Sequence, residues 1–176
     1  STALGSSAVM DAIENNIPVY ASSGTLLSLR KKGVLTDCHT DFTLNDEGVE
    51  INGMFVKPFK TSHDCADGRA YVITGCDGVT RAAIATDTGY VSPELLEAIT
   101  GSKMVYIESN HDVAMLRTGP YPYPLQKRIL SNFGHLSNDA CADVLTALIN
   151  KGTTHVTLAH LSRENNTPQL ALEAVG

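Results

Sequence analysis

The run from Arg81 to Ala85 is short and apolar, and the chain then reaches Asp87 within a Thr-Asp-Thr-Gly sequence. A run of this kind is typical of a buried strand. A carboxylate at the end of such a strand is costly to bury unless it is paired, hydrogen-bonded or bound to a metal. The run therefore predicts a sheet that delivers one acidic side chain to its edge, and we expect Asp87 to be a metal ligand.

The segments before this run indicate a mixed α/β fold. Apolar residues recur at helical spacing over 4–15, a short strand is expected over 17–21, and a second helix over 25–32 ends at Gly33. Strands are expected over 42–44, 49–51, 54–59, 71–74 and 80–85, with an Asn-Gly turn at 52–53. These strands predict an antiparallel meander whose last strand leads to Asp87.

The segments after Asp87 alternate between helix and strand. Ser92 and Pro93 are typical of a helix start, and this helix should end near Thr100. The apolar run over 104–108 is typical of a strand in a parallel sheet. Further helices are expected over 111–117, 124–132 and 137–150, followed by a strand over 154–159 and a helix from Thr167. We find no repeat or linker, so residues 1–176 are expected to form one domain.

The composition excludes several classes of protein. The chain has 176 residues, of which 43% are hydrophobic and 18% charged, as in an ordinary globular domain. Its four cysteines show no Cys-x-x-Cys spacing, so neither a zinc ribbon nor a disulfide framework is indicated. No apolar run is long enough to span a bilayer, and we see no signal pattern. We expect a cytoplasmic protein with no membrane partner, and homo-oligomer formation is left open.

The net charge of −6 argues against a protein that coats nucleic acid by bulk electrostatics. Affinity for a phosphate backbone comes largely from clustered lysine and arginine side chains. An acidic protein can still process nucleic acid if bound metal ions supply the local positive charge. Net charge therefore weakens the nucleic-acid hypothesis without removing it.

Two histidines lie at the predicted ends of strands. His63 lies in the loop between two strands of the meander, where Asp64 can orient its imidazole as an acceptor. His160 directly follows the last predicted strand. Both are candidate metal ligands beside Asp87, and a plain surface histidine is the alternative for His63.

Other candidate residues lie at predicted helix starts. His135, with Ser137 and Asn138, precedes or opens the helix over 137–150, where backbone N–H groups favour an anion such as phosphate. His111 opens an earlier helix, and Arg163 can hold a phosphate oxygen as a bidentate donor. We expect His135 and His111 to act in catalysis together with Asp87, and we expect Ser137, Asn138 and Arg163 to bind substrate. Capping loops with incidental histidines are the alternative.

The Asp-Thr-Gly sequence at 87–89 also occurs in aspartic proteases, whose paired catalytic carboxylates lie in such a turn. That mechanism needs a second Asp-Thr-Gly or an obligate dimer. The mixed α/β pattern also differs from the β-barrels of those enzymes. We therefore disfavour a protease.

Five motifs occur in a fixed order along the chain. They are Ser-His-Asp-x-Ala-Asp at 62–67, Thr-Asp-Thr-Gly at 86–89, Glu-Ser-Asn-His-Asp at 108–112, Gly-His-Leu-Ser-Asn at 134–138 and Ala-His-Leu-Ser-Arg-Glu-Asn-Asn at 159–166. Together they resemble the motifs of the metallo-β-lactamase-fold hydrolases, specifically the YycJ/WalJ-type branch. The resemblance covers about residues 5–172.

The resemblance implies a four-layer αββα sandwich with two metal ions, zinc or manganese, between its sheets. It implies that Asp87 bridges the two metals, that His63 and His160 are further ligands, and that His135 contacts the scissile phosphate or leaving group. A bridging carboxylate can hold two cations roughly 3.5–4 Å apart, where they activate water for in-line displacement at phosphorus. The implied activity is that of a metal-dependent phosphodiesterase, a DNA nuclease of the 5′–3′ exonuclease type.

The main ligand motif of these hydrolases, His-x-His-x-Asp-His, does not occur in the 176 residues. We therefore expect the chain to correspond to the C-terminal two-thirds of the fold, without its N-terminal strands, and to have partial or no metal occupancy and no useful activity by itself. A fragment of a split protein and a domain that has lost its metal are the alternatives. For function, the alternatives are a small-molecule hydrolase of the same fold and a non-catalytic interaction module.

Overall fold

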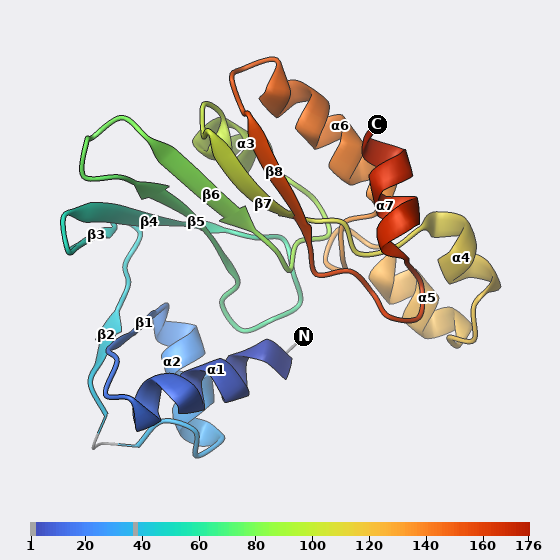
Figure 1. Ribbon diagram of the computed structural model, residues 1–176. Coiled ribbons are helices and arrows are strands. Elements are labelled where there is room, and N and C mark those ends of the chain that lie inside the picture. The colour runs from blue at the N-terminus through green and yellow to red at the C-terminus, as the bar shows by residue number, and fades with distance from the viewer. Residues whose placement is uncertain (1–2, 37–38) are drawn as a thin grey trace.

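The computed structural model of the protein describes residues 3–36 and 39–176 (Figure 1). Over these residues the chain forms a two-stranded sheet and a six-stranded sheet with the strand order β3-β4-β5-β6-β7-β8. The six strands are β3 (Val49–Ile51), β4 (Met54–Lys60), β5 (Arg69–Thr74), β6 (Arg81–Ala85), β7 (Met104–Glu108) and β8 (His155–Ala159). The mixed α/β class expected from the sequence is confirmed.

Strands β3 to β6 are antiparallel neighbours, as predicted, whereas β6, β7 and β8 pair in parallel. The turn between β3 and β4 places Asn52 at φ 50° and Gly53 at φ 79°, which is the left-handed backbone that an Asn-Gly hairpin turn requires. The pairing becomes parallel where α3 (Pro93–Ile99) connects β6 to β7. As a result, β6, β7 and β8 all end at the same edge of the sheet.

The first part of the chain forms a small unit of its own, made of α1 (Ala3–Glu14), β1 (Val19–Ala21), α2 (Ser23–Lys31) and β2 (Asp41–Thr43). The strand predicted over 42–44 does not begin the meander as we expected. It pairs in parallel with β1, and the rings of Tyr20 and Phe42 stack with centroids 4.8 Å apart. The prediction was wrong because a local alternation pattern identifies a strand but not its partner.

The remaining helices are α4 (Val113–Thr118), α5 (Tyr123–Ile129), α6 (Asn138–Ile149) and α7 (Pro168–Val175). The predicted start of α3 is confirmed, because the Ser92 side chain accepts a hydrogen bond from the backbone N–H of Leu95. The main core lies between the sheet and the helices, where buried side chains of β6 and β7 meet those of α3 and α6. Figure 1 shows α6 and α7 beside β8, far from the small unit.

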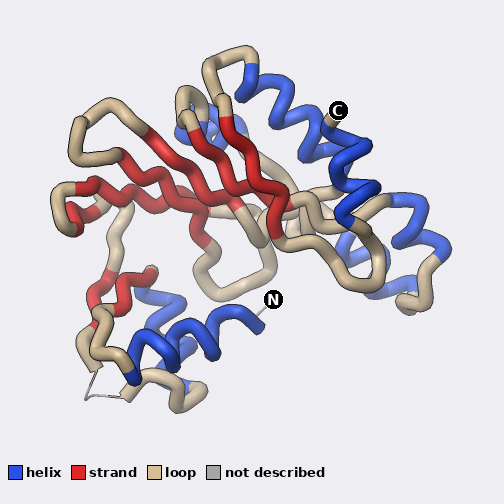
Figure 2. The backbone as a smooth tube through the Cα atoms, viewed as in Figure 1, coloured by secondary structure: helices blue, strands red, loops and turns tan. Residues whose placement is uncertain are grey.

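The face of the sheet that bears Ile84, Met104 and Tyr106 leaves these apolar side chains 37–42% exposed. Ile84 and Tyr106 are direct neighbours in the register of β6 and β7. Figure 2 shows the six strands as one continuous layer with the two-stranded sheet apart from it. An apolar sheet face of this kind is suited to a further layer, and the second sheet of an αββα sandwich stays a prediction.

None of the described helices combines the length and apolar character that crossing a bilayer requires. Among the described cysteines, Cys65, Cys76 and Cys141 are free thiols. Cys38 lies outside the described residues.

Candidate metal centre

Three neighbouring strands each bring a polar side chain to one edge of the sheet. Asp87 follows β6, Glu108 is the last residue of β7, and His160 directly follows β8. His135 joins them from the loop before α6. One potential ligand atom from each of these four residues lies within 4.8 Å of the others. Parallel pairing therefore gathers side chains that lie up to 73 positions apart in the sequence, as between 87 and 160.

Two of these residues have an unusual backbone. Asp87 has φ 53° and His160 has φ 56°, the left-handed region that residues with a Cβ rarely adopt. Such a conformation costs on the order of 1–3 kcal/mol and persists only where the surroundings enforce it. Backbone strain after β6 and after β8, the strands on either side of β7, is typical of a functional site.

Glu108 is fully buried, and both of its carboxylate oxygens accept hydrogen bonds. Its Oε1 accepts from Nδ1 of His135 at 2.7 Å and from Nδ1 of His160 at 2.6 Å, while Oε2 accepts from the backbone N–H of Thr88 at 2.8 Å. Burial by itself would raise the pKa of Glu108, but the hydrogen bonds from the two imidazoles outweigh it and leave that pKa below its ordinary value. The same contact raises the pKa of His160. Glu108 therefore anchors two imidazoles by Nδ1.

Asp87 presents a carboxylate oxygen that lacks a hydrogen-bond partner among the described residues, although this Oδ1 is buried. Three imidazole nitrogens face it, namely Nε2 of His160 at 3.6 Å, Nε2 of His63 at 3.9 Å and Nδ1 of His135 at 3.9 Å. These separations are too long for direct hydrogen bonds. They match two ligands that share one metal ion, since metal–ligand distances of about 2.0–2.2 Å separate ligand atoms by roughly 3–4 Å. The donor set therefore fits a divalent metal ion.

His63 is almost fully buried and is held from the side opposite Asp87. Its Nδ1 donates a hydrogen bond to the backbone carbonyl of Gly134 at 2.7 Å, which directs Nε2 toward Asp87. We expected Asp64 to orient this ring, but Asp64 lies on the Nε2 side at 3.5 Å and is bound by Arg128. The hydrogen bond from Arg128 lowers the pKa of Asp64. The prediction for Asp64 was therefore wrong, because a backbone carbonyl takes the orienting role.

The three imidazoles near Asp87 form a row. The ring centroids of His63 and His135 are 4.7 Å apart, and those of His135 and His160 are 5.1 Å apart. His135 lies in the middle, anchored by Glu108 rather than aimed at Asp87 through Nε2. His63 and His160 thus present Nε2 to Asp87, whereas the central ring of His135 faces it with the Nδ1 that is bonded to Glu108.

The other predicted site residues lie around this centre. His111 is 1% exposed, and burial lowers its pKa to about 4, so the ring is neutral near pH 7. Ser137 caps α6 by accepting a hydrogen bond from the N–H of Ala140. Asn138 is buried, and its side chain is bonded to Ser109 and Asn166. Arg163 is exposed. Roles in catalysis or substrate binding for these four stay predictions.

Comparison with known proteins identifies relatives of this chain. No protein-family model matches the chain. The chain is 36% identical over 162 residues to exodeoxyribonuclease YycJ of Bacillus anthracis, a match that covers 91% of this chain and 60% of that protein. It is 38% identical over 116 residues to exodeoxyribonuclease WalJ of Streptococcus pneumoniae, covering 66% of this chain and 42% of that protein. The chain thus spans less than two thirds of the length of either relative.

Several solved structures resemble it with TM-scores above 0.6. The metallo-β-lactamase fold protein YhfI from Bacillus subtilis gives a TM-score of 0.68 at 15% identity and covers 94% of this chain and 61% of that one. The chain has the metallo-β-lactamase fold. Zn²⁺-bound PqqB from Methylobacterium extorquens gives a TM-score of 0.62 at 17% identity, covering 96% and 61%.

Glu108 is the residue of this metallo-β-lactamase-fold chain that the sequence interpretation overlooked. The run Met104-Val-Tyr-Ile-Glu108 is an apolar strand ending in a carboxylate, which is the pattern that identified Asp87. Applied a second time, the same reasoning about buried charge would have found it. Within the motif at 108–112, the sequence analysis assigns a role to His111 and none to Glu108.

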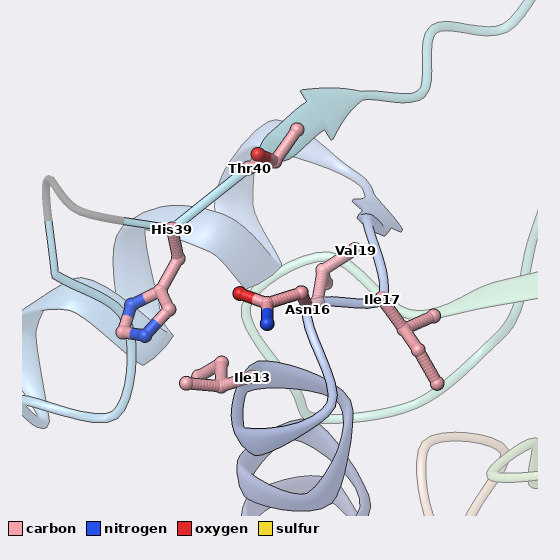
Figure 3. A pocket seen from close by; sticks show the side chains of 6 residues that line it. All are labelled: Ile13, Asn16, Ile17, Val19, His39 and Thr40. Carbon is pink, nitrogen blue, oxygen red and sulfur yellow. The ribbon is translucent and has the colours of Figure 1, made fainter.

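The metallo-β-lactamase-fold chain also has a hollow in its small N-terminal unit (Figure 3). It is lined by Ile13, Asn16, Ile17, Val19, His39 and Thr40. Its lining contains one titratable side chain, His39, and none of the residues around Asp87. The hollow is therefore separate from the candidate metal centre.

Replacing Gly134 with alanine is expected to disturb the His63 side of the centre. A Cβ at this position would lie 2.1 Å from the carbonyl oxygen of Ile129 and 2.4 Å from that of Arg128, so the backbone must shift. Overpacking of this kind costs about 1–3 kcal/mol. We expect a lower free energy of unfolding in denaturant and weaker metal binding by calorimetry, because the carbonyl that holds His63 moves with the backbone.

Gly75 offers the matched control for this substitution. A Cβ there would meet no atom closer than 3.3 Å, the side-chain oxygen of Asp77. Gly75→Ala should therefore change stability and metal binding much less. Equal effects of the two substitutions would contradict the steric argument.

Proposed function

We propose that this chain belongs to a metal-dependent phosphodiesterase that degrades DNA from its ends. The observation that carries the proposal is the buried Oδ1 of Asp87, which faces three imidazole nitrogens and has no hydrogen-bond partner among the described residues. The similarity to proteins named exodeoxyribonucleases supports DNA as the substrate. An activity on cellular DNA also implies an intracellular location, and we propose the cytoplasm.

We assign the metal-binding role to Asp87, His63 and His160. Both imidazoles present Nε2 to Asp87 while Nδ1 is fixed by the Gly134 carbonyl or by Glu108. An imidazole fixed in this way keeps the tautomer and ring orientation that a metal ligand needs. We propose that these residues would hold divalent metal, two ions of zinc or manganese in the complete protein. Such ions supply Lewis-acid assistance to a phosphoryl oxygen and activation of water.

We assign proton transfer to His135. Its Nδ1 donates to Glu108, so Nε2 is the atom that can give a proton to the leaving oxygen. The hydrogen bond to Glu108 fixes the orientation of the ring. Glu108 therefore connects the proton donor to the ligand His160 through a single oxygen atom.

The remaining candidates are proposed to act on the substrate's phosphates. Arg163 follows His160 closely in sequence and is exposed, so its guanidinium can bind a phosphate oxygen in bidentate fashion. Ser137 and Asn138 lie at the N-terminus of α6, where backbone N–H groups favour anions. For His111 we propose a catalytic role instead, because its ring is neutral and buried and its Nε2 lacks a hydrogen-bond partner in the described part of the chain.

The test is a nuclease assay on the complete protein that contains this chain. We expect release of mononucleotides from the 5′ end of labelled DNA, loss of this activity with a chelator, and recovery on adding Mn²⁺ or Zn²⁺. Hydrolysis of a small phosphodiester, lactone or thioester without DNA hydrolysis would instead favour a small-molecule hydrolase of the same fold. Chelator-insensitive DNA hydrolysis would contradict the proposal, and no hydrolysis at all would favour a non-catalytic interaction module.

A further inference from the structure

Two large aromatic side chains are exposed beside the candidate metal centre. Tyr90 is 44% exposed and lies three positions after Asp87, and Phe133 is 63% exposed and lies two positions before His135. Each therefore belongs to a short segment that also carries a site residue. A single exposed aromatic residue is ordinary in a folded protein. Two of them on the segments that build one site call for an explanation.

The two segments are packed against each other. The backbone at Gly89 lies so close to Ser131 and Asn132 that a Cβ on Gly89 would be 2.5 Å from the Ser131 carbonyl oxygen. The N–H of Gly89 also donates to the carbonyl of Ser62 at 2.8 Å, next to His63. Tyr90 therefore lies next to the point where the loops that carry Ser62, Gly89 and Ser131 contact one another.

Phe133 is fixed to the same group of loops through its backbone. Its carbonyl accepts a hydrogen bond from the N–H of Asp64 at 3.1 Å, and the next residue, Gly134, accepts from His63. The backbone is thus held at the metal centre while the ring is left in solvent. A backbone fixed in this way reduces the conformational freedom that Phe133 loses when its ring stacks on a partner.

The charges nearby are compatible with a nucleic-acid strand. Lys127 and Arg128 are exposed in the last turn of α5, shortly before Phe133. Arg128 neutralises Asp64, the acidic side chain next to His63. An aromatic surface with lysine and arginine beside it is typical of single-strand binding, in which bases stack on the rings and the backbone follows the basic residues.

We propose that Tyr90 and Phe133 stack on unpaired nucleobases at the end of a single strand and so select single-stranded or frayed DNA ends over blunt duplex ends. The inference rests on the proposed function, since it assigns a substrate preference to the same site. Stacking needs an accessible base face, and bases within a duplex hide theirs between neighbours. The two rings therefore select the substrate, whereas the residues around Asp87 carry out the hydrolysis.

The inference is tested by binding, with the complete protein and two fluorescent probes of equal length and charge. One probe is an oligothymidylate, and the other is the same backbone without bases. We expect the native protein to bind the oligothymidylate at least about five-fold more tightly, because stacking contributes about 1–3 kcal/mol per base. Phe133→Ala and Tyr90→Ala should each reduce this ratio, whereas Phe133→Trp should retain it.

Two comparisons complete the experiment. Val79→Ala alters a residue that is 75% exposed in the β5–β6 turn, and it should leave binding of both probes unchanged. Unchanged ratios in the Phe133→Ala and Tyr90→Ala proteins would overturn the inference. The nuclease assay of the native protein judges the proposed function separately. A base-dependent ratio without hydrolysis would leave the stacking site standing and remove the proposed activity.

Discussion

Asp87→Asn is expected to abolish metal-dependent hydrolysis and to weaken metal binding by more than about 100-fold, since loss of residues that merely support a ligand already costs about 10–100-fold. Asparagine is the best-matched substitution here. It keeps the size of the side chain, and it tolerates the left-handed backbone that Asp87 adopts at φ 53°. The effect should therefore come from the lost negative charge and ligand oxygen.

The same substitution should not destabilise the metal-free protein. Oδ1 of Asp87 is buried without a hydrogen-bond partner in the described residues, so the native carboxylate is present at a cost to folding. Removing that charge should leave the melting temperature of the metal-free protein unchanged or higher. A loss of function without a loss of stability is typical of residues that serve a site rather than the fold.

Calorimetric metal titration and thermal unfolding, each with and without metal, measure the two effects. Asp143→Asn is the matched control, because Asp143 is an exposed aspartate on α6, on the outside of the helix. It should change neither metal affinity nor stability. Native-like metal binding by the Asp87→Asn protein would contradict the assignment of Asp87 as a ligand.

The strand and helix pattern of the chain was largely predictable from its sequence, because periodicity, turns and caps are local signals. Ser92 and the Asn52-Gly53 turn illustrate this, since each determines structure within a few residues. The partner of a strand is not a local property. The segment over 41–43 accordingly formed a strand as expected but paired with β1 instead of joining the meander.

The positions of Asp87 and His160 were predictable because a residue type and a strand end coincide there, while their role as ligands stays a prediction. The site was not predictable where the deciding contact is a backbone carbonyl or a distant buried amide. The carbonyl of Gly134 accepts a hydrogen bond from His63, which lies 71 positions earlier in the sequence. Every residue has a backbone carbonyl, so the sequence does not indicate which one accepts this bond. Asn138 and Asn166 are buried and bonded to each other, although asparagine in a loop suggests exposure. Their burial depends on tertiary packing.

Glu108→Gln is expected to have the opposite balance of effects from Asp87→Asn. The carboxylate accepts three hydrogen bonds, from His135, His160 and Thr88. Glutamine has the same shape, but its NH₂ group cannot accept, so at least one buried donor loses its partner. An unsatisfied buried group costs about 1–3 kcal/mol. The metal-free protein should therefore lose about that much of its free energy of unfolding in a denaturant titration.

Metal affinity should also fall by about 10–100-fold in the Glu108→Gln protein, because His160 loses the contact that fixes its Nδ1 and directs its Nε2. Nitrogen NMR of the imidazoles should show His135 and His160 shifting toward mixed tautomers, a change that loss of stability alone does not produce. Glu97→Gln, at an exposed position of α3, is the matched control and should change none of these readouts.

The two carboxylates are expected to differ in how their replacement changes the stability of the metal-free protein. Asp87 has an oxygen without a protein partner and should be dispensable for stability, whereas Glu108 has three donors and should be required for it. If Glu108→Gln left both the free energy of unfolding and the metal affinity unchanged, Glu108 would not be the anchor of the two imidazoles. If Asp87→Asn destabilised the metal-free protein as strongly as Glu108→Gln, the difference between ligand and anchor would not hold.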